Sequence, residues 1–304
     1  MKQQPMNRSH FLQQLGLLAA GSITLPGFLF RKSTNFTPLR NNTGIFSMQG
    51  GTIGWFVSDD VIVAIDSQFP DPARAFLNGI DEFGGGPEKI LINTHHHGDH
   101  TGGNLVFETN GYRIIAHENV PVLQQQAAQA NDTEANQAYA GITFTDSHEL
   151  NISGETITAH HYGPAHTKGD SVIWFKEANI AHMGDLIFNR LYPFIDRNSG
   201  ALITGWINLL ETVHSEADTD TLFIFGHGNP EFGVTGSRED LLVLRNFLSH
   251  LLEYTQNGIQ SGKSREEITE VSQFDEFPGF LSPSAFLSLP RNIDVAWREL
   301  TGTE

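Results

Sequence analysis

The sequence predicts a domain of mixed α and β structure in which helices pack outside two sheets. Three observations support this prediction. Apolar runs of strand length recur in both halves of the chain, amphipathic segments with helix-capping residues lie between them, and each half carries histidines and aspartates close to such runs. Periodicity by itself allows either an α/β or an α+β order, so the arrangement of the layers stays open at this point.

The first half of the chain alternates expected strands with one well-marked helix. Apolar residues indicate strands at residues 44–48, 52–57, 61–65, 90–93 and 113–116. Asp71 followed by Pro72 is a favourable helix start, Phe76 begins the apolar face of this helix, and the glycines at 84–86 end it. Residues 118–140 are rich in Gln, Ala and Asn, and their low hydrophobicity predicts an exposed helix or a mobile flap.

The second half repeats the alternation. Strands are expected at residues 155–160, 172–175, 180–183 and 222–225. A helix is expected at 206–214, and Ser237 is expected to cap another helix that carries leucines on one face. Ser264 and Glu267 have the spacing of a capping box, which predicts a further helix start.

A dense group of metal-binding side chains follows the expected strand at 90–93. Residues 94–100 read Thr-His-His-His-Gly-Asp-His, which places four histidines and one aspartate within six residues. Imidazole and carboxylate groups are ligands of zinc and of non-haem iron. Purification tags and metal-buffering tracts are also rich in histidine, so the spacing within the run carries more weight than the count. A ligand loop at the end of a buried strand predicts a metal site at one edge of a sheet.

The spacing His-x-His-x-Asp-His at residues 95–100 resembles the first motif of the metallo-β-lactamase superfamily. The segments that resemble the later motifs of this family, in the same order, are 163–167 (GPAHT), 184–186 (GDL) and 225–228 (FGHG). The resemblance extends over about residues 45–227. It implies an α+β fold, a four-layer αββα sandwich, formed by a single domain over residues 33–304.

The resemblance also implies a metal site with seven ligands and two zinc ions, for which iron or manganese are alternatives. The expected ligands are His95, His97 and His166 for the first ion, Asp99, His100 and His227 for the second, and Asp185 as the bridge. Paired ions of this kind share a hydroxide that attacks the substrate at neutral pH. Asp99 is also the expected catalytic residue, because it could orient the hydroxide and pass a proton to the leaving group.

Several neighbouring residues have two interpretations. His96 alternates with its neighbours, so it is expected to point away from the metals. Asp66 and Asp170 either orient metal-bound histidines or shape turns. Aromatic residues near the later motifs either line a substrate groove or, the preferred interpretation, pack in the core. These aromatic residues are Tyr192, Phe194, Trp206, Phe274, Phe277 and Phe280.

The resemblance implies a hydrolase that cleaves an ester, thioester, lactone or lactam-type bond in a small molecule, and the N-terminal segment described below predicts that it is exported. The chain contains no cysteine, which excludes the cysteine-containing ligand set of one group of zinc β-lactamases. With Asp185 present, the set is more similar to the glyoxalase II, lactonase and arylsulfatase branch. The alternatives are a β-lactamase-like activity, an iron-dependent oxidoreductase on the same fold, and a non-catalytic metal or ligand carrier.

The acidic composition of the chain limits the kinds of molecule that it is expected to bind. Lys and Arg number 18 against 35 Asp and Glu, which gives a net charge of −17 over 304 residues. Such a charge repels polyanions, so binding to nucleic acid or to an anionic membrane surface is not expected. The oligomeric state cannot be read from the sequence. A chain of this length buries a sizeable core without disulfides.

Residues 1–32 are expected to be an export signal, so that the mature protein is periplasmic or secreted. Lys2 and Arg8 precede a short apolar stretch at 11–21, which is typical of a targeting segment. Residues 7–12 (NRSHFL) resemble a twin-arginine signal in degenerate form, with serine in place of the second arginine. A membrane-anchoring helix is the alternative, although the Gln, Gly and Pro residues here disfavour stable insertion.

Overall fold

The computed structural model describes residues 35–303 of the chain. They divide into two compact units, the first formed by residues up to 159 with 175–178 and the second by 160–174 with the residues from 179 onward. The export signal expected at residues 1–32 lies outside the described residues, and the single domain at 33–304 stays a prediction. Among the described helices, none is long and apolar enough to cross a membrane.

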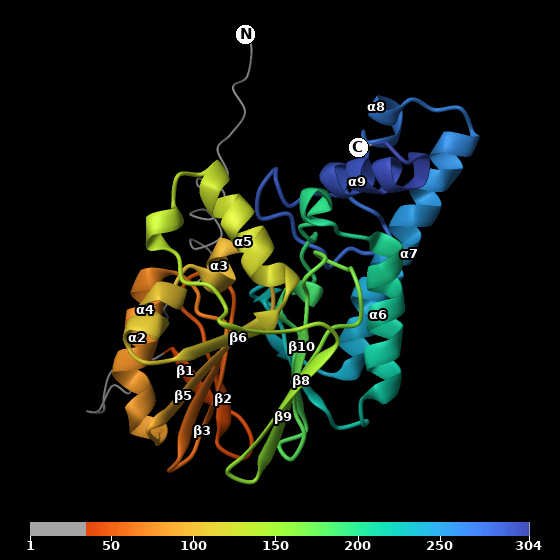
Figure 1. Ribbon diagram of the computed structural model, residues 1–304. Coiled ribbons are helices and arrows are strands. Elements are labelled where there is room, and N and C mark those ends of the chain that lie inside the picture. The colour runs from red at the N-terminus through yellow and green to blue at the C-terminus, as the bar shows by residue number, and fades with distance from the viewer. Residues whose placement is uncertain (1–34, 304) are drawn as a thin grey trace, which may run out of the picture. The chain divides into compact units, whose positions relative to one another are not determined.

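A seven-stranded sheet forms the framework of the first unit (Figure 1). Its strands are adjacent in chain order: β1 (Phe36–Pro38), β2 (Thr43–Phe46), β3 (Ile53–Val57), β4 (Val61–Ile65), β5 (Glu88–Asn93), β6 (Arg113–His117) and β7 (Ile142–Phe144). β1 to β4 pair antiparallel, whereas β4 to β7 pair parallel. The parallel strands leave their carboxyl ends at one edge, where α/β sheets commonly bind ligands. Asp66 follows β4 there, and the 94–100 loop follows β5.

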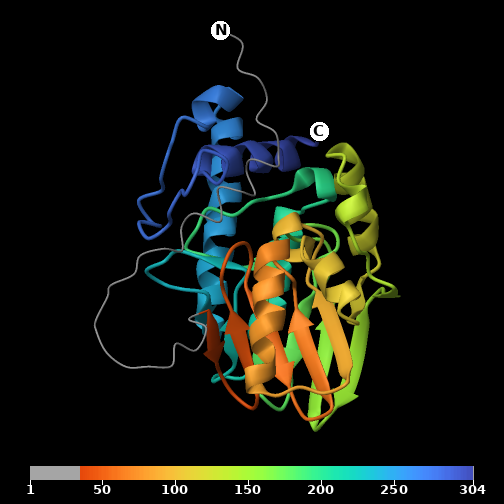
Figure 2. The ribbon, with the colours of Figure 1, turned by 90° about the vertical axis from the view of Figure 1, so that its left-hand side faces the viewer.

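Helices cover one face of this sheet, the face that Figure 2 shows with α2 in front. The helical elements of the first unit are α2 (Pro70–Gly79), η1 (Ile80–Phe83), α3 (Gly98–Thr101), α4 (Asn104–Thr109), α5 (Asn119–Ala130) and η2 (Glu134–Asn136). Phe76 of α2 and Phe107 of α4 are fully buried and stack with ring centroids 5.6 Å apart. They share a core with Trp55 and Leu91 of the sheet, so burial of these apolar faces holds the helices on the sheet.

The first unit also contains the neighbouring strands β8 (Ser147–Ile152) and β9 (Glu155–His160). Ser153 and Gly154 connect them with φ angles of 52° and 79°. A backbone with positive φ favours glycine, which suits a tight turn between two strands. Buried and partly exposed residues alternate along β9, as expected for a strand with one covered face.

In the second unit the strands form two groups. Four strands are adjacent in the order β15 (Thr235–Gly236), β13 (Leu222–Ile224), β11 (Ile180–His182) and β10 (Val172–Phe175). β12 (Phe188–Asn189) and β14 (His227–Gly228) form a separate parallel pair in which Phe188 lies opposite His227. This pair brings a segment that follows Asp185 beside the predicted ligand His227.

The helices of the second unit share one core with its strands. They are η3 (Gly184–Leu186), η4 (Arg197–Ser199), α6 (Ile203–Glu216), α7 (Arg238–Gln260), α8 (Arg265–Ile268) and α9 (Leu289–Thr301). Trp206 of α6, Leu248 of α7 and Ile293 of α9 are fully buried in this core. α6 and α7 lie side by side, and α9 packs on α7 (Figure 1). The helix start predicted at Ser237 and the capping box predicted at Ser264 are both present, and Ser237 also forms a capping box with Asp240.

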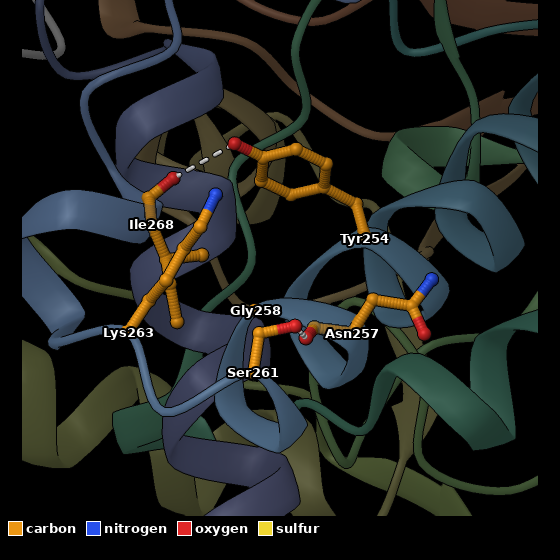
Figure 3. A pocket seen from close by; sticks show the side chains of 6 residues that line it. All are labelled: Tyr254, Asn257, Gly258, Ser261, Lys263 and Ile268. Carbon is orange, nitrogen blue, oxygen red and sulfur yellow. Dashed lines mark hydrogen bonds between the residues drawn. The ribbon is translucent and has the colours of Figure 1, made fainter.

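A small pocket of about 160 Å³ lies where α7 meets α8 (Figure 3). Its lining residues are Tyr254, Asn257, Gly258, Ser261, Lys263 and Ile268. The Tyr254 hydroxyl donates a hydrogen bond to the carbonyl of Ile268 at 3.3 Å. A Cβ atom on Gly258 would lie 2.8 Å from Cγ1 of Ile268, so glycine permits this close helix approach. The pocket contains none of the predicted metal ligands.

Most predicted elements are present, and the largest difference concerns residues 118–140. The helix there, α5, ends at Ala130, and Asp132 adopts a positive φ of 55° that interrupts the helical backbone. Val120 and Leu123 are buried, so this helix packs against the unit rather than standing exposed. The strands β1, β7 and β8 were not predicted, because β1 and β7 have only three residues each and β8 is mostly polar.

Candidate metal centre

In the first unit, the predicted ligands lie on the loop that follows β5 and on the short helix α3. His97 adopts an extended conformation, with φ −63° and ψ 146°, and α3 begins at the next residue, Gly98. This change of direction sets the side chains of the loop around one point at the sheet edge. His95, Asp99 and His100 are buried, with exposed fractions of 1%, 3% and 0%. Buried polar groups of this kind require partners.

Three imidazole rings converge in this loop. The ring centroid of His95 lies 4.8 Å from that of His97 and 4.2 Å from that of His100. Nε2 of His95 lies 3.1 Å from Nδ1 of His97, so the two nitrogens point to the same place. The His96 ring lies farther from His95, at 6.4 Å. That His96 does not bind metal stays a prediction.

Asp66 organises the loop from the end of β4. Its carboxylate accepts hydrogen bonds from the backbone nitrogen and the hydroxyl of Thr94, both at 2.8 Å, and lies 2.7 Å from Nδ1 of His100. The Thr94 hydroxyl in turn lies 3.0 Å from Nδ1 of His95. Because Nδ1 of His95 and of His100 makes these contacts, Nε2 is the nitrogen through which each ring would bind a metal. The sequence allowed two roles for Asp66, and the contacts favour the orientation of histidines.

In the second unit, the carboxylate of Asp185 lies between two histidines. One oxygen lies 3.7 Å from Nε2 of His166 and the other lies 3.4 Å from Nε2 of His227. All three side chains are buried, with at most 8% of any residue exposed. A carboxylate placed in this way can contribute one oxygen to each of two ions.

Packing and one backbone group hold these histidines. Nδ1 of His166 lies 2.7 Å from the carbonyl oxygen of Phe194, so this nitrogen carries the proton and Nε2 faces Asp185. The Phe188 ring lies 5.6 Å from the His166 ring and stacks on the His227 ring at 5.4 Å. Trp206 also contacts His166, at 5.5 Å, and donates its ring N–H to the carbonyl of Leu186.

Two glycines allow the backbone to approach Asp185. A Cβ atom on Gly226 would lie 2.0 Å from a carboxylate oxygen of Asp185, which no larger residue could accommodate without displacing it. Gly226 donates its N–H to the carbonyl of Gly184 at 2.7 Å, and Gly184 has a φ of 50°. Nδ1 of the buried His182 accepts the N–H of Gly184 at 3.1 Å. None of these three contacts was predicted from the sequence.

Asp170 shapes the turn beside His166. Its carboxylate accepts hydrogen bonds from the backbone nitrogen and hydroxyl of Thr167, both at 2.7 Å. Asp170 could either orient a metal-bound histidine or shape a turn. Because Nδ1 of His166 contacts the Phe194 carbonyl, the contacts of Asp170 with Thr167 favour the turn role. The Phe194 carbonyl was not predicted, because a backbone acceptor has no signature in the residue types.

The aromatic residues considered as pocket walls belong largely to the core of the second unit. Four of the six are buried and two are partly buried against that core. The buried ones are Tyr192, Trp206, Phe274 and Phe280, and the partly buried ones are Phe194 and Phe277. Core packing, the preferred interpretation, is therefore confirmed for the four buried residues.

The donors of both units fit a divalent metal ion. They are imidazole nitrogens and carboxylate oxygens, which zinc, iron and manganese accept. In three of the histidines one ring nitrogen is engaged by protein and the other faces a further predicted ligand. Such second contacts fix the tautomer and the ring orientation of metal ligands. The ligation of each residue stays a prediction.

Residues 65–237 match the family model described as the metallo-beta-lactamase superfamily. The chain is similar to the 2,4-dinitroanisole O-demethylase subunit alpha of Nocardioides sp. (strain JS1661), with 24% identity over 187 residues. This match covers 60% of the chain and 55% of the relative, so the chain spans about half the length of that protein.

Two solved structures have the same fold. The inverting sec-alkylsulfatase Pisa1 from Pseudomonas sp. is 14% identical, with a TM-score of 0.68 over 89% of this chain and 50% of its own. A metallo-beta-lactamase from Pontibacter korlensis is 17% identical, with a TM-score of 0.56 over 70% of this chain and 98% of its own. These likenesses confirm the predicted fold class, a mixed fold with two large sheets packed against helices.

Proposed function

This chain belongs to the metallo-beta-lactamase superfamily, and we propose that it is a metal-dependent hydrolase of small molecules. The observation that carries the proposal is the position of Asp185, whose two oxygens face Nε2 of His166 at 3.7 Å and Nε2 of His227 at 3.4 Å. A carboxylate with a histidine nitrogen near each oxygen is suited to bridging two divalent ions.

The proposed ions are two zinc ions per chain, and iron or manganese would accept the same donors. The proposed ligands are His95, His97 and His166 for the first ion, Asp99, His100 and His227 for the second, with Asp185 as the bridge. The 3.1 Å separation of the facing nitrogens of His95 and His97 supports a shared ion. Nε2 of His100 and a carboxylate oxygen of Asp99, 3.9 Å apart, support another.

The chain's own residues have distinct tasks in the proposed reaction. When bound, the zinc pair supplies Lewis acidity at the scissile carbonyl and lowers the pKa of water to about 7. Asp99, which is 3% exposed, is the proposed catalytic residue. Its carboxylate accepts a proton from the attacking water and returns it to the leaving group. Asp66 and the Phe194 carbonyl hold the imidazoles of His100 and His166 in one orientation throughout.

The proposed substrate contains an ester, thioester, lactone or lactam-type bond. The chain's net charge of −17 disfavours polyanionic substrates. The names of similar proteins add a nitroaryl methyl ether, a secondary alkyl sulfate and a β-lactam to the compounds worth testing. A β-lactamase-like activity is therefore one outcome of the same substrate panel.

Elemental mass spectrometry on protein made without added metal, with activity screened on the same sample, tests the proposal. We expect two zinc ions per chain, and hydrolysis that a chelator removes and zinc restores. One or two irons with no hydrolysis would contradict the hydrolase and favour the oxidoreductase alternative. Bound zinc without turnover of any compound in the panel would favour a carrier.

Replacing Asp99 by asparagine tests its catalytic role. We expect kcat to fall by about 10²–10⁴-fold, the usual contribution of a positioned acid–base group. Asp146→Asn, at an exposed aspartate of the same unit, is the matched control and should keep wild-type activity. Equal kcat values for the two variants would remove Asp99 from the mechanism.

Export to the periplasm or the medium is part of the proposal and rests on the positive, then apolar, pattern of residues 2–21. Cell fractionation with mass spectrometry of the mature N-terminus tests it. Recovery in the cytoplasm with an intact N-terminus would contradict export.

A further inference from the structure

The segment Asp66-Ser67-Gln68 surrounds His100. The side chain of Asp66 contacts Nδ1 of His100 at 2.7 Å, and Ser67 donates its N–H and its hydroxyl to the His100 carbonyl at 2.7 and 3.0 Å. All three residues are fully buried, and Asp66 and Gln68 adopt positive φ angles of 63° and 53°. Two non-glycine residues in this conformation indicate a backbone held by its surroundings at a functional position.

Gln68 extends these contacts to the loop between β2 and β3, residues 47–52. Its side-chain Nε2 donates to the carbonyl oxygens of Gly51 and Phe46, the latter at 3.4 Å. The backbone carbonyl of Gln68 accepts the N–H of Gly103, just after α3, at 2.8 Å. One buried residue therefore joins the 47–52 loop to the segment that carries the predicted ligands.

Gly51 is the point at which that loop meets the ligands. Its N–H donates to the carbonyl of Asp99 at 3.0 Å. A Cβ atom at this position would lie 2.2 Å from Cε1 and 2.4 Å from Nε2 of His100. The backbone of Gly51 thus lies against the ring edge that bears the proposed metal-binding nitrogen, and only glycine leaves room for the ring.

We propose that Gln68 and Gly51 form a clamp that positions Nε2 of His100 and the backbone of Asp99 for the second metal ion. Gln68 locates Gly51, and the backbone of Gly51 limits the position of the His100 ring, whose Nδ1 contacts Asp66. Both are positioning residues, since they act through His100 and Asp99. The inference rests on the proposed function, which assigns the second ion to these two ligands.

Two variants and two matched controls test the clamp. Gly51→Ala pushes a methyl group against His100, and Gln68→Met removes the amide donor at similar length. Gly44→Ala makes the same 2.2 Å intrusion against the ring of Trp55 in the same hairpin. Gln124→Met removes a similarly buried amide that donates to Gln137 and Ala138 instead. The controls report the general loss of stability.

The first readout is the imidazole ¹H–¹⁵N spectrum of the metal-free full-length protein. We expect the Nδ1–H resonance of His100 to shift or broaden in Gly51→Ala and Gln68→Met and to persist in both controls. The second readout is competition between the protein and a chelator for Zn²⁺. We expect affinity for the weaker-bound ion to fall about 10–100-fold in the two variants, as for other groups that orient metal ligands, and to stay at the wild-type value in the controls.

The outcomes separate the clamp from the proposed function. Wild-type zinc affinity and an unchanged His100 resonance in Gly51→Ala or Gln68→Met would overturn the clamp, as would equal losses in variants and controls. If Gly51→Ala does not fold, Gln68→Met decides the question. A wild-type protein that binds zinc without hydrolysing any substrate contradicts the proposed function while the variant affinities still support the clamp. A wild-type protein that takes up no divalent metal overturns both.

Discussion

The two clusters of proposed ligands in this protein are built in different ways. The cluster of the first unit comes from one continuous segment, residues 95–100. This segment is held mainly by polar contacts with the buried residues that follow β4, such as those of Asp66 and Ser67 with His100. The cluster of the second unit comes from three distant segments and depends on ring packing around Phe188 and on the Phe194 carbonyl. A contiguous cluster can be oriented by polar contacts, whereas a dispersed one also requires a packed core to bring its members together.

Two similar Asp–Thr contacts, one in each unit, illustrate this difference. Asp66 and Asp170 each accept hydrogen bonds from the backbone nitrogen and hydroxyl of a threonine, Thr94 and Thr167, at 2.7–2.8 Å. Asp66 in addition contacts Nδ1 of a predicted ligand. In the second unit, a backbone carbonyl contacts the equivalent nitrogen of His166. The same local motif therefore contacts a proposed metal ligand in one unit and shapes a turn in the other.

The largest effect is expected from removing the ring that packs between the two histidines. Phe188→Ala should destabilise the protein by about 3–5 kcal/mol, as other buried Phe truncations do, and should also weaken zinc binding because His166 and His227 lose their common contact. Phe107→Ala, in the core of the first unit, is the control. It should lower the melting temperature similarly while zinc affinity is retained. Equal zinc affinities in the two variants would show that packing does not hold the dispersed cluster.

A smaller effect is expected from the two aspartates. Asp66→Asn should lower zinc affinity about 10–100-fold, since it removes the charged partner of His100. Asp170→Asn should change it much less, because Nδ1 of His166 keeps its contact with Phe194. Chelator competition measures both. Equal losses would mean that the two Asp–Thr motifs have the same role and would remove the distinction between the clusters.

The smallest effect concerns pH and a group outside both clusters. Burial raises the pKa of Glu155 from 4.5 to about 7, although hydrogen bonds from the backbone N–H groups of Glu177 and Ala178 oppose this. The pKa of Glu155 is therefore higher in the folded than in the unfolded protein. Between pH 4.5 and about 7 the folded protein binds more protons than the unfolded protein, so its stability falls as the pH rises through this range.

Glu155→Gln removes this titration. The melting temperature of the variant minus that of the wild type should therefore increase from pH 5 to pH 8 in metal-free protein. A difference that does not change with pH would contradict the assignment. The pH dependence of stability that comes from Glu155 should be measured first. It can then be subtracted when the pH dependence of the two clusters is compared.

The residues of the candidate site could be selected from the sequence because the proposed ligands are of unusual residue types within short motifs. The run at 95–100, the segment at 163–167 and the later Gly-Asp and Gly-His pairs supplied all seven proposed ligands. The helix starts predicted at Ser237 and Ser264 are both present. The exact extent of α5 was not predictable, because the burial of Val120 and Leu123 depends on the rest of the unit.

The sequence by itself determined the mixed fold class, the identity of the candidate ligands and the chemistry open to them, because these follow from residue type and local spacing. Only the tertiary structure decided how the ligands are supported. The contact of Gly51 with His100, the approach of Gly226 to Asp185 and the bond between the Phe194 carbonyl and His166 all join residues far apart in the chain. They depend on backbone position rather than side-chain type, and a backbone position is set when the whole unit packs.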